Sequence, residues 1–259
     1  EEDHKLACED DGTESFYQNF SSLDTAYKNG NYWVVISPQK KMRIQFTDSG
    51  PLVAKTPELI DLKITDYCNI GCSFCYQDST TAGKHASMKE IKGIINATQD
   101  YGKLTEYAIG GGEPTTHPEF TDILKHLRLR SSIANFTTKS REWFNNPELV
   151  EEVKKSVSGI AYSVDSLEEA LEFQVLHKEA FVSSGATKKA PAFYLHLIPE
   201  IMGHDVFREI IGEVDVINSK NRFDPFKINI TLLGFKSQGR GEDTSPELLP
   251  EIVDIITLA

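Results

Sequence analysis

The sequence predicts an α/β fold in which strands and helices alternate along most of the chain. A length of 259 residues suits one large α/β domain. From residue 58 onward, six short apolar or alternating segments are each followed by a segment with helical periodicity. This alternation favours parallel strands joined by right-handed crossovers. An open, doubly wound sheet and a partial barrel both satisfy it, so periodicity alone does not separate them.

The chain is expected to contain an N-terminal extension, residues 1–57, and a main domain, residues 58–259. Residues 1–20 are acidic and irregular, as is typical of a loose tail. The segments NYWVVI (31–36) and KMRIQF (41–46), separated by SPQK, predict a β-hairpin with a four-residue turn. The extension is expected to pack on the main domain as a cap, or to contribute a strand that recognises substrate.

Six strand–helix units are expected in the main domain. The strands are predicted at residues 59–65, 105–110, 133–138, 159–165, 192–198 and 227–234. The helices are predicted at residues 87–101, 118–130, 141–157, 166–184, 205–219 and 245–259. Pro147 is expected to interrupt the third helix, because proline removes a helical hydrogen bond. In either architecture, ligands gather at the carboxyl ends of the strands.

Composition narrows the classes of partner. The 27 Lys and Arg residues against 39 Asp and Glu residues give a net charge of −12. This charge opposes broad contact with nucleic acid or with an anionic membrane. No apolar run reaches the ~20 residues of a membrane span, and no signal segment is recognisable. The chain is therefore predicted to be cytoplasmic, where clustered cysteines more often bind metal or do chemistry than form disulfides.

Three of the four cysteines, Cys68, Cys72 and Cys75, follow the first predicted strand with C-x3-C-x2-C spacing. Four interpretations compete: a structural zinc site completed by His85, a disulfide with one thiol left over, chance clustering of structural cysteines, and an iron–sulfur cluster. The remaining cysteine, Cys8, lies far upstream. The spacing favours a cluster with one iron left open for a small molecule, because open metal positions distinguish catalytic sites from structural ones.

Two motifs carry a resemblance to a known family. CNIGCSFC, with the aromatic Phe74 before the third cysteine, resembles the signature of the radical S-adenosylmethionine (radical SAM) superfamily. GGGEP, residues 110–114, ends the second predicted strand and resembles that family's GGE motif. The resemblance implies a partial (β/α)6, TIM-like barrel, so the predicted fold is this barrel with an N-terminal β-hairpin extension.

The resemblance also implies an activity. Cys68, Cys72 and Cys75 would hold three irons of a 4Fe–4S cluster, and S-adenosylmethionine would chelate the fourth iron. An external one-electron reductant of flavodoxin or ferredoxin type would reduce the cluster. Reductive cleavage of S-adenosylmethionine would give a 5′-deoxyadenosyl radical that abstracts hydrogen from substrate. The cofactor supplies this chemistry, while the protein supplies binding and orientation.

Further contacts with S-adenosylmethionine are predicted by the same resemblance. The backbones of Gly110, Gly111 and Gly112 would approach its methionine moiety, and Glu113 would accept from its ammonium group. The other predicted cofactor-binding residues are Phe74, Thr138, Ser163, Asp165 and Gly234. Asp165 has an alternative role as a helix N-cap. Thr138, Lys139 and Ser140 depart from the TNG-like turn of many members, and Lys236 and Arg240 could meet a substrate carboxylate or phosphate.

The substrate class is expected to be a peptide or a small metabolite. The alternatives are an enzyme acting on a nucleotide or RNA, which the negative charge opposes, and a non-catalytic iron–sulfur module. No cysteine follows Cys75, so an auxiliary cluster is not predicted. His196 is predicted to be a core histidine, His117 to be part of a helix start, and Tyr67 and Tyr76 to shield the cysteine loop from water.

Overall fold

The computed structural model describes residues 25–36, 41–46, 50–99, 105–182, 190–220 and 226–246. The chain divides into two compact units, residues 1–57 and 58–259, and each is described by itself. The predicted acidic tail, the predicted turn at 37–40 and nearly all of the predicted helix at 245–259 lie outside the described residues. In the described part of the chain, no helix is both long and apolar enough to cross a membrane.

The first unit contains a three-stranded antiparallel sheet. Its strands are β1 (Thr25–Asn29), β2 (Tyr32–Ile36) and β3 (Lys41–Ile44), in the order β1-β2-β3. The predicted hairpin corresponds to β2 and β3, whereas β1 was not predicted. Asn29 explains this omission: it is fully buried, and its side chain accepts from the backbone N–H of Lys55 and Thr56 and donates to the Thr56 carbonyl. A polar residue buried through such distant contacts leaves no apolar pattern in the sequence.

The second unit is built on a six-stranded parallel sheet, as predicted. The strands lie side by side in chain order, β4-β5-β6-β7-β8-β9, and every neighbouring pair is parallel. Their bounds are β4 Leu59–Thr65, β5 Glu106–Gly111, β6 Ile133–Thr138, β7 Val157–Ser163, β8 Ala192–Leu197 and β9 Ile228–Leu232. The strands are parallel and follow chain order, and in the described part of the chain the edge strands β4 and β9 do not pair with each other. This is the arrangement of a partial barrel, so the predicted fold class is confirmed.

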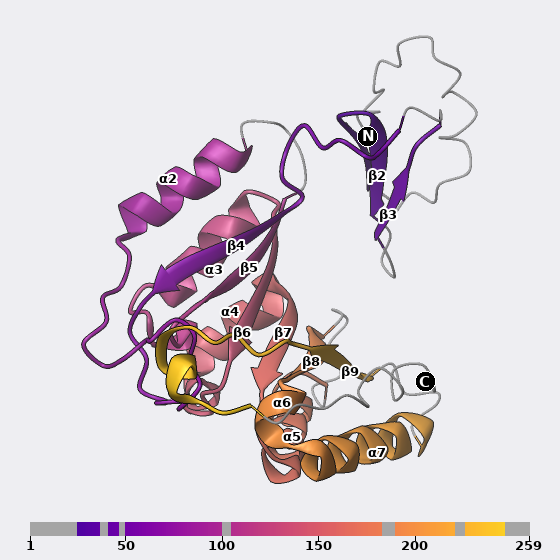
Figure 1. Ribbon diagram of the computed structural model, residues 1–259. Coiled ribbons are helices and arrows are strands. Elements are labelled where there is room, and N and C mark those ends of the chain that lie inside the picture. The colour runs from indigo at the N-terminus through magenta and orange to yellow at the C-terminus, as the bar shows by residue number, and fades with distance from the viewer. Residues whose placement is uncertain are drawn as a thin grey trace. The chain divides into compact units, whose positions relative to one another are not determined.

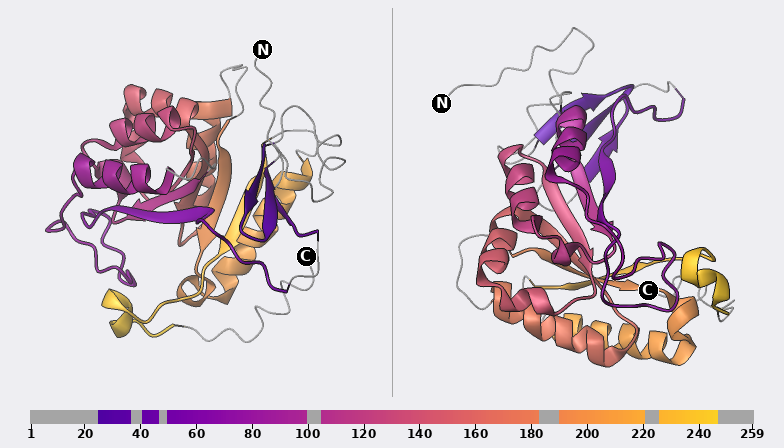
Figure 2. Two further views of the ribbon diagram at one scale, coloured as in Figure 1. Left: turned by 90° about the horizontal axis from the view of Figure 1, so that it is seen from above. Right: turned by 90° about the vertical axis from the view of Figure 1, so that its left-hand side faces the viewer.

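Helices connect the strands and cover one face of this sheet (Figures 1 and 2). Side chains alternate along each strand, so Leu62 and Ile64 of β4 and Tyr107 and Ile109 of β5 are buried toward the helices. The helices are α2 Met88–Gln99, α3 Phe120–Leu129, α4 Pro147–Ser156, α5 Leu167–His177, α6 Pro199–Met202 and α7 His204–Lys220. The apolar layer between sheet and helices is the main hydrophobic core.

Local sequence signals account for the helix boundaries. The predicted break at Pro147 is confirmed: a short turn, η2 (Glu142–Asn145), ends there and α4 begins with Pro147 in its first turn. Asn146 caps α4 by accepting from the backbone N–H of Leu149 at 3.2 Å. The Lys178–Val182 segment continues from α5 as a π-helical turn, and the short helix α6 was not predicted.

A buried histidine lies among aromatic rings between α5, β7 and β8. His177 is fully buried, and its Nε2–H donates to the Pro191 carbonyl at 3.1 Å. Its Nδ1 accepts from the Tyr162 hydroxyl at 2.9 Å, which fixes the neutral tautomer. Burial lowers the pKa of His177 to about 4, partly offset by the hydrogen bond to Pro191. The ring is therefore a neutral part of the core at physiological pH.

Acid should destabilise the fold through His177. Because its folded pKa of about 4 lies below the ordinary value of 6.5, the unfolded state binds the proton first as the pH falls. Stability should be fully present above pH 6.5 and be lost between pH 6.5 and 4, by about 3 kcal/mol from this residue. His177→Gln should flatten the pH dependence of the unfolding free energy in urea by about this amount. An equal slope in variant and wild type would contradict this account of the core.

Candidate functional site

The three clustered cysteines lie on an irregular loop, residues 66–80, that follows β4 and is called here the cysteine loop. Its two ends are joined: the Cys68 N–H donates to the Thr80 carbonyl at 3.0 Å, and Tyr67 and Thr80 form an isolated bridge. Between them, the N–H of Cys75 donates to the Cys72 carbonyl at 3.4 Å. The chain thus folds back on itself at the carboxyl end of β4, where the parallel-strand fold is expected to bind ligands.

The thiols of Cys68, Cys72 and Cys75 are free and half-buried. Burial raises the pKa of the Cys72 thiol, and the Lys139 cation opposes this shift. The Asp165 carboxylate and the other two cysteines raise the pKa further, so the three thiols interact electrostatically. Among the described residues, no three Cys, His, Asp or Glu side chains converge tightly enough for a single metal ion. A 4Fe–4S cluster places each thiolate on a different iron, and this donor set fits it better than it fits one zinc ion.

His85 was the residue that could have completed a zinc site. Its Nδ1 lies 2.9 Å from the Thr65 hydroxyl, and its ring packs between those of Tyr67 and His117, with centroids at 5.4 and 5.0 Å. His117 in turn lies 2.9 Å through Nε2 from the Ala86 carbonyl, and its Nδ1 accepts from the Glu119 N–H, so its predicted local role at a helix start is confirmed. These contacts give both histidines structural partners.

The glycine loop after β5 lies directly against the start of the cysteine loop. Gly111 has a φ of +121°, and a Cβ there would lie 2.2 Å from the Thr65 carbonyl oxygen. A Cβ at Gly112 would lie 2.0 Å from the Tyr67 carbonyl oxygen. Only glycine fits at these two positions. Around Gly110, by contrast, a Cβ would meet nothing within 4 Å, so this backbone remains accessible to a ligand.

Glu113 connects the ends of β5 and β6. It is 2% exposed, and its carboxylate accepts five hydrogen bonds. Oε1 accepts from the N–H and hydroxyl of Thr115 at 3.2 and 2.6 Å and from the Thr138 hydroxyl at 2.8 Å. Oε2 accepts from the N–H of Lys139 and Ser140 at 3.0 and 3.2 Å. Glu113 and Thr138 therefore shape the loops themselves, and their contact with the cofactor stays a prediction.

Charged residues pair at the ends of β6 and β7. Lys139 Nζ lies 2.5 Å from the Asp165 carboxylate and 3.1 Å from that of Glu169. Burial lowers the pKa of Lys139, but the hydrogen bond to Asp165 and the two carboxylate charges outweigh it, so the net shift is upward. The N-cap of α5 is Ser166, which accepts from Glu169 N–H, so the capping alternative for Asp165 is wrong. Asp165 instead pairs with Lys139, whose positive charge lowers the pKa of the Cys72 thiol.

The remaining predicted contacts are spread around the same edge of the sheet. Ser163 ends β7, is half-exposed and pairs in register with His196 of β8. Phe74 is half-buried in the cysteine loop, and Gly234 is exposed just after β9, with open space around its Cβ position. The predicted contacts of Ser163, Phe74 and Gly234 with S-adenosylmethionine therefore also stay predictions.

Two cations expected at the substrate rim contact the cysteine loop, and their contact with substrate stays a prediction. Lys236 Nζ lies 4.1 Å from the centroid of the Tyr76 ring, and Arg240 hydrogen-bonds to the loop backbone. The glycines on either side of Arg240 indicate a close backbone approach, but they do not identify the cysteine loop as the partner. Tyr67 is half-buried and Tyr76 is 45% exposed, so their predicted shielding role stays a prediction.

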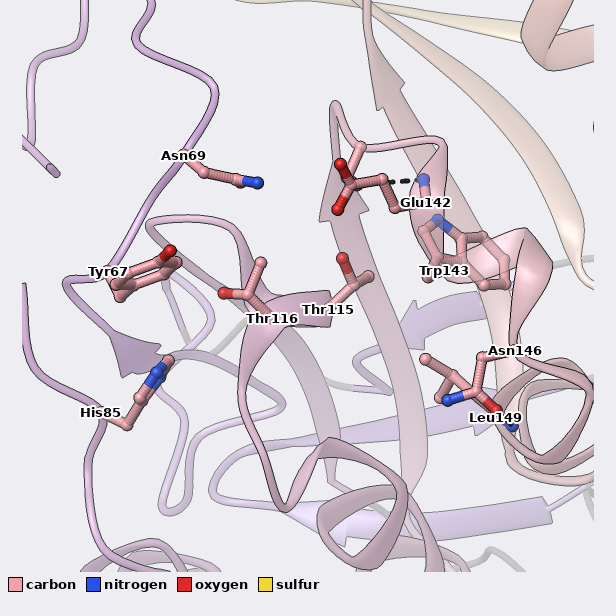
Figure 3. Close-up of a pocket in the computed structure, with 10 residues that line it drawn as sticks. Tyr67, Asn69, His85, Thr115, Thr116, Glu142, Trp143, Asn146 and Leu149 are labelled. Carbon is pink, nitrogen blue, oxygen red and sulfur yellow. Dashed lines mark hydrogen bonds between the residues drawn. The ribbon is translucent and has the colours of Figure 1, made fainter. Parts of the chain in front are cut away.

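A pocket of about 420 Å³ lies beside the glycine loop (Figure 3). Its lining is mostly polar and comes from the cysteine loop, from His85 beyond that loop, from the turn η1 (Pro114–Thr116) and from residues 140–149, which lead into α4 and form its start. The lining residues are Tyr67, Asn69, His85, Thr115, Thr116, Ser140, Glu142, Trp143, Asn146 and Leu149. Sequence patterns did not predict this pocket, because it forms only when three separate loops meet.

Comparisons with known proteins agree with the fold and the motifs. Residues 62–184 match the model of the radical SAM superfamily. GTP 3′,8-cyclase of Vibrio parahaemolyticus is 28% identical over 125 residues, covering 46% of this chain and 37% of that protein. GTP 3′,8-cyclase of Cronobacter sakazakii is 23% identical over 197 residues, covering 74% of this chain and 50% of that protein. The chain thus spans half or less of the length of these curated relatives.

Solved structures show the same fold. The crystal structure of Streptococcus suis SuiB bound to S-adenosylmethionine superposes with a TM-score of 0.60 at 12% identity, covering 83% of this chain and 63% of SuiB. SuiB bound to its precursor peptide SuiA superposes with a TM-score of 0.54 at 15% identity, covering 71% of this chain and 41% of that one. Residues 62–184 therefore carry the radical SAM match, and the cofactors of that superfamily are a 4Fe–4S cluster and S-adenosylmethionine.

Proposed function

We propose that this chain is a radical SAM enzyme that abstracts hydrogen from a peptide or small-metabolite substrate. The observation that carries the proposal is the cysteine loop, which carries three free thiols at the carboxyl end of β4 and whose start lies against Gly111 and Gly112 of the glycine loop. Three thiolates on a 4Fe–4S cluster leave one iron without a protein ligand. When bound, the cluster and S-adenosylmethionine supply a 5′-deoxyadenosyl radical by reductive cleavage, with the electron coming from a flavodoxin- or ferredoxin-type partner.

The protein's own residues position the reactants. Cys68, Cys72 and Cys75 would ligate the cluster, and the Gly110 backbone would lie against the methionine moiety. Glu113 holds the exits of β5 and β6 in a fixed relation through its five hydrogen bonds. The further contacts proposed for S-adenosylmethionine are those of Gly111, Gly112, Glu113, Phe74, Thr138, Ser163, Asp165 and Gly234. Fixed geometry of this kind contributes to catalysis by orienting the reacting atoms.

The sheet face opposite the helices suggests where substrate binds. Gly159 of β7 is flanked on this face by the side chains of Asn135 and Tyr194, which would lie 3.1 and 3.3 Å from a Cβ at that position. Asn135 also donates to Glu106 at 2.7 Å. His196 faces the same side, because it alternates with the core residues Leu195 and Leu197. This face is rich in neutral hydrogen-bonding groups and carries the carboxylate of Glu106.

The charge of this face favours a neutral or cationic substrate over a nucleoside triphosphate. Burial lowers the pKa of His196 to about 4, so the ring is neutral at physiological pH. Lys63 of β4 is ion-paired with Asp66. Within the described strands, β4 to β9, Lys63 and His196 are the basic residues whose side chains alternate onto the face away from the core. Neither of them offers an unpaired positive charge. A triphosphate normally needs cationic partners, so a peptide or small metabolite fits better.

A nucleotide substrate is the second candidate, favoured by the similarity to GTP 3′,8-cyclases. A third possibility is an iron–sulfur module without turnover. SuiB shares the fold, and its structure includes a bound precursor peptide. For this chain, the proposal of a peptide substrate rests on the charge of the sheet face described above. Localisation in the cytoplasm, where reduced clusters and thiols persist, is part of the same proposal.

Deuterium transfer from a substrate to 5′-deoxyadenosine can distinguish the three candidate functions. The reconstituted chain, reduced under anaerobic conditions with S-adenosylmethionine, is supplied with a fully deuterated cell extract, and 5′-deoxyadenosine is examined for deuterium by mass spectrometry. We expect deuterium incorporation that survives phosphatase treatment of the extract and is not reproduced by deuterated GTP. Loss of incorporation after phosphatase, or incorporation from GTP, would establish the nucleotide candidate instead. Absence of any 5′-deoxyadenosine would support the non-catalytic module.

A further inference from the structure

The segment after β9 reaches back to the cysteine loop across more than half of the chain. Its residue Arg240 makes four hydrogen bonds to that loop. The guanidinium donates through Nε to the Cys72 carbonyl at 2.9 Å, through Nη2 to the Ser79 carbonyl at 3.0 Å and through Nη1 to the Asp78 carboxylate at 2.9 Å. The Arg240 backbone N–H donates to the Cys75 carbonyl at 3.1 Å.

These acceptors span the part of the loop that carries two of the three ligands. The stretch from Cys72 to Ser79 belongs to no helix or strand. Its own turns supply few donors: Cys75 N–H to Cys72 carbonyl at 3.4 Å, and Asp78 N–H to Cys75 carbonyl at 3.2 Å. A planar guanidinium with donors in fixed directions can hold several acceptors at once, which a lysine ammonium cannot reproduce. Arg240 therefore supplies the order that regular secondary structure would otherwise provide.

The glycines on either side of Arg240 allow its segment to approach the cysteine loop closely. Gly239 has a φ of +55°, and a Cβ there would lie 2.8 Å from the Cys75 carbonyl oxygen and 2.9 Å from the Tyr76 carbonyl oxygen. A Cβ at Gly241 would lie 2.4 Å from the Lys236 carbonyl oxygen. Two glycines thus allow a tight turn, η4 (Gly239–Asp243), to press its backbone against the cysteine loop. The Lys236 ammonium over the Tyr76 ring adds a further contact.

We infer that Arg240 is a positioning residue for the iron–sulfur cluster, and that residues 236–244 form a clasp that holds the cysteine loop in its ligand-presenting shape. The clasp acts through the backbone of Cys72 and Cys75 rather than through contact with iron. It lies outside the matched family segment, which ends at residue 184. The inference rests on the cluster assignment and is independent of the substrate proposed above.

The clasp is tested with Arg240→Ala and Arg240→Lys in the full, cluster-loaded chain. Hydrogen exchange of the amides of residues 68–80 is measured anaerobically by mass spectrometry, together with the rate at which a chelator removes iron. Loss of charge-assisted hydrogen bonds should speed exchange in this loop by about tenfold or more in both variants, and iron loss should accelerate with it. Exchange in β6 and β7 should remain that of wild type. Arg240→Lys should not rescue the loop, because one ammonium cannot span three acceptors.

Arg128→Gln is the matched control. Arg128 Nε donates to the buried Glu152 and to Ser156 at 3.1 Å each, between α3 and α4 and away from the cysteine loop. This variant should lower global stability without selective exchange in residues 68–80. Gly239→Ala provides a second test that keeps the guanidinium but drives the backbone away from the Cys75 carbonyl, and it should reproduce the Arg240→Ala pattern.

Wild-type exchange and wild-type iron retention in both Arg240→Ala and Gly239→Ala would overturn the clasp. If Arg240→Ala does not fold, Gly239→Ala and Arg240→Lys decide the question by the same measurements. Neither measurement needs a substrate, so failure of the clasp would leave the proposed function intact. Failure of the proposed function would in turn leave the exchange result standing.

Discussion

Cys72→Ala is expected to abolish assembly of the 4Fe–4S cluster and, with it, cleavage of S-adenosylmethionine. Cys72 is the central cysteine of the C-x3-C-x2-C loop and the proposed ligand of one iron. A cluster already short of one protein ligand has no spare donor, so we expect reconstituted iron and sulfide to fall to roughly a tenth of wild type or less. Iron and sulfide analysis, with electron paramagnetic resonance of the reduced protein, measures the effect directly.

Cys8→Ala is the control for this variant. It removes the one cysteine outside the loop, at a position outside the described residues, and should leave cluster content and spectrum unchanged. A Cys72→Ala protein that kept a full cluster and its cleavage activity would contradict the ligand assignment. The same would follow if Cys8→Ala lost the cluster while Cys72→Ala kept it.

Replacement of Glu113 should have the second large effect. In Glu113→Ala, the backbone N–H of Lys139 and the N–H of Thr115 lose their acceptor, while the N–H of Ser140 keeps only the Thr138 hydroxyl at 3.0 Å. Each unsatisfied buried donor costs about 1–3 kcal/mol, so the free energy of unfolding should fall by about 3–5 kcal/mol. Cleavage of S-adenosylmethionine should fall as well, because the ends of β5 and β6 lose their shared anchor.

Glu113→Gln should be milder, for a reason that the geometry supplies. A glutamine can keep its carbonyl oxygen toward the N–H groups of Lys139 and Ser140 and turn its NH₂ toward the hydroxyls of Thr115 and Thr138, which can also accept, so that only the Thr115 N–H loses its acceptor. We expect a loss of about 1–2 kcal/mol in urea unfolding. Glu142→Gln, at an exposed neighbour, should stay within about 0.5 kcal/mol of wild type. Wild-type stability in Glu113→Ala would contradict the anchoring role.

The strand–helix alternation was predictable because burial of one sheet face leaves a regular apolar pattern. Ile64, Ile109 and Phe136 show this on β4, β5 and β6, each buried against the helix layer. The motif residues were predictable for a different reason: Cys72 and its neighbours have a spacing that only a few kinds of site use. Local rules also placed the interruption at Pro147.

Contacts between distant residues were not predictable. Arg240 meets Cys72 across 168 positions, and nothing in the local sequence of either residue identifies the other. The burial of Asn29 and the pairing of Lys139 with Asp165 have the same origin, since each depends on how separate loops approach one another. Three of the five hydrogen bonds to Glu113, those from Thr138, Lys139 and Ser140, likewise exist only once β5 and β6 are neighbours.

The cysteine loop is proposed to support reductive cleavage of S-adenosylmethionine. The most direct measurement incubates the reconstituted, reduced chain with S-adenosylmethionine under anaerobic conditions and quantifies 5′-deoxyadenosine and methionine by mass spectrometry. Our account predicts equal amounts of both products from wild type and neither product from Cys72→Ala. A fully loaded wild-type protein that binds the cofactor and forms no 5′-deoxyadenosine would contradict it.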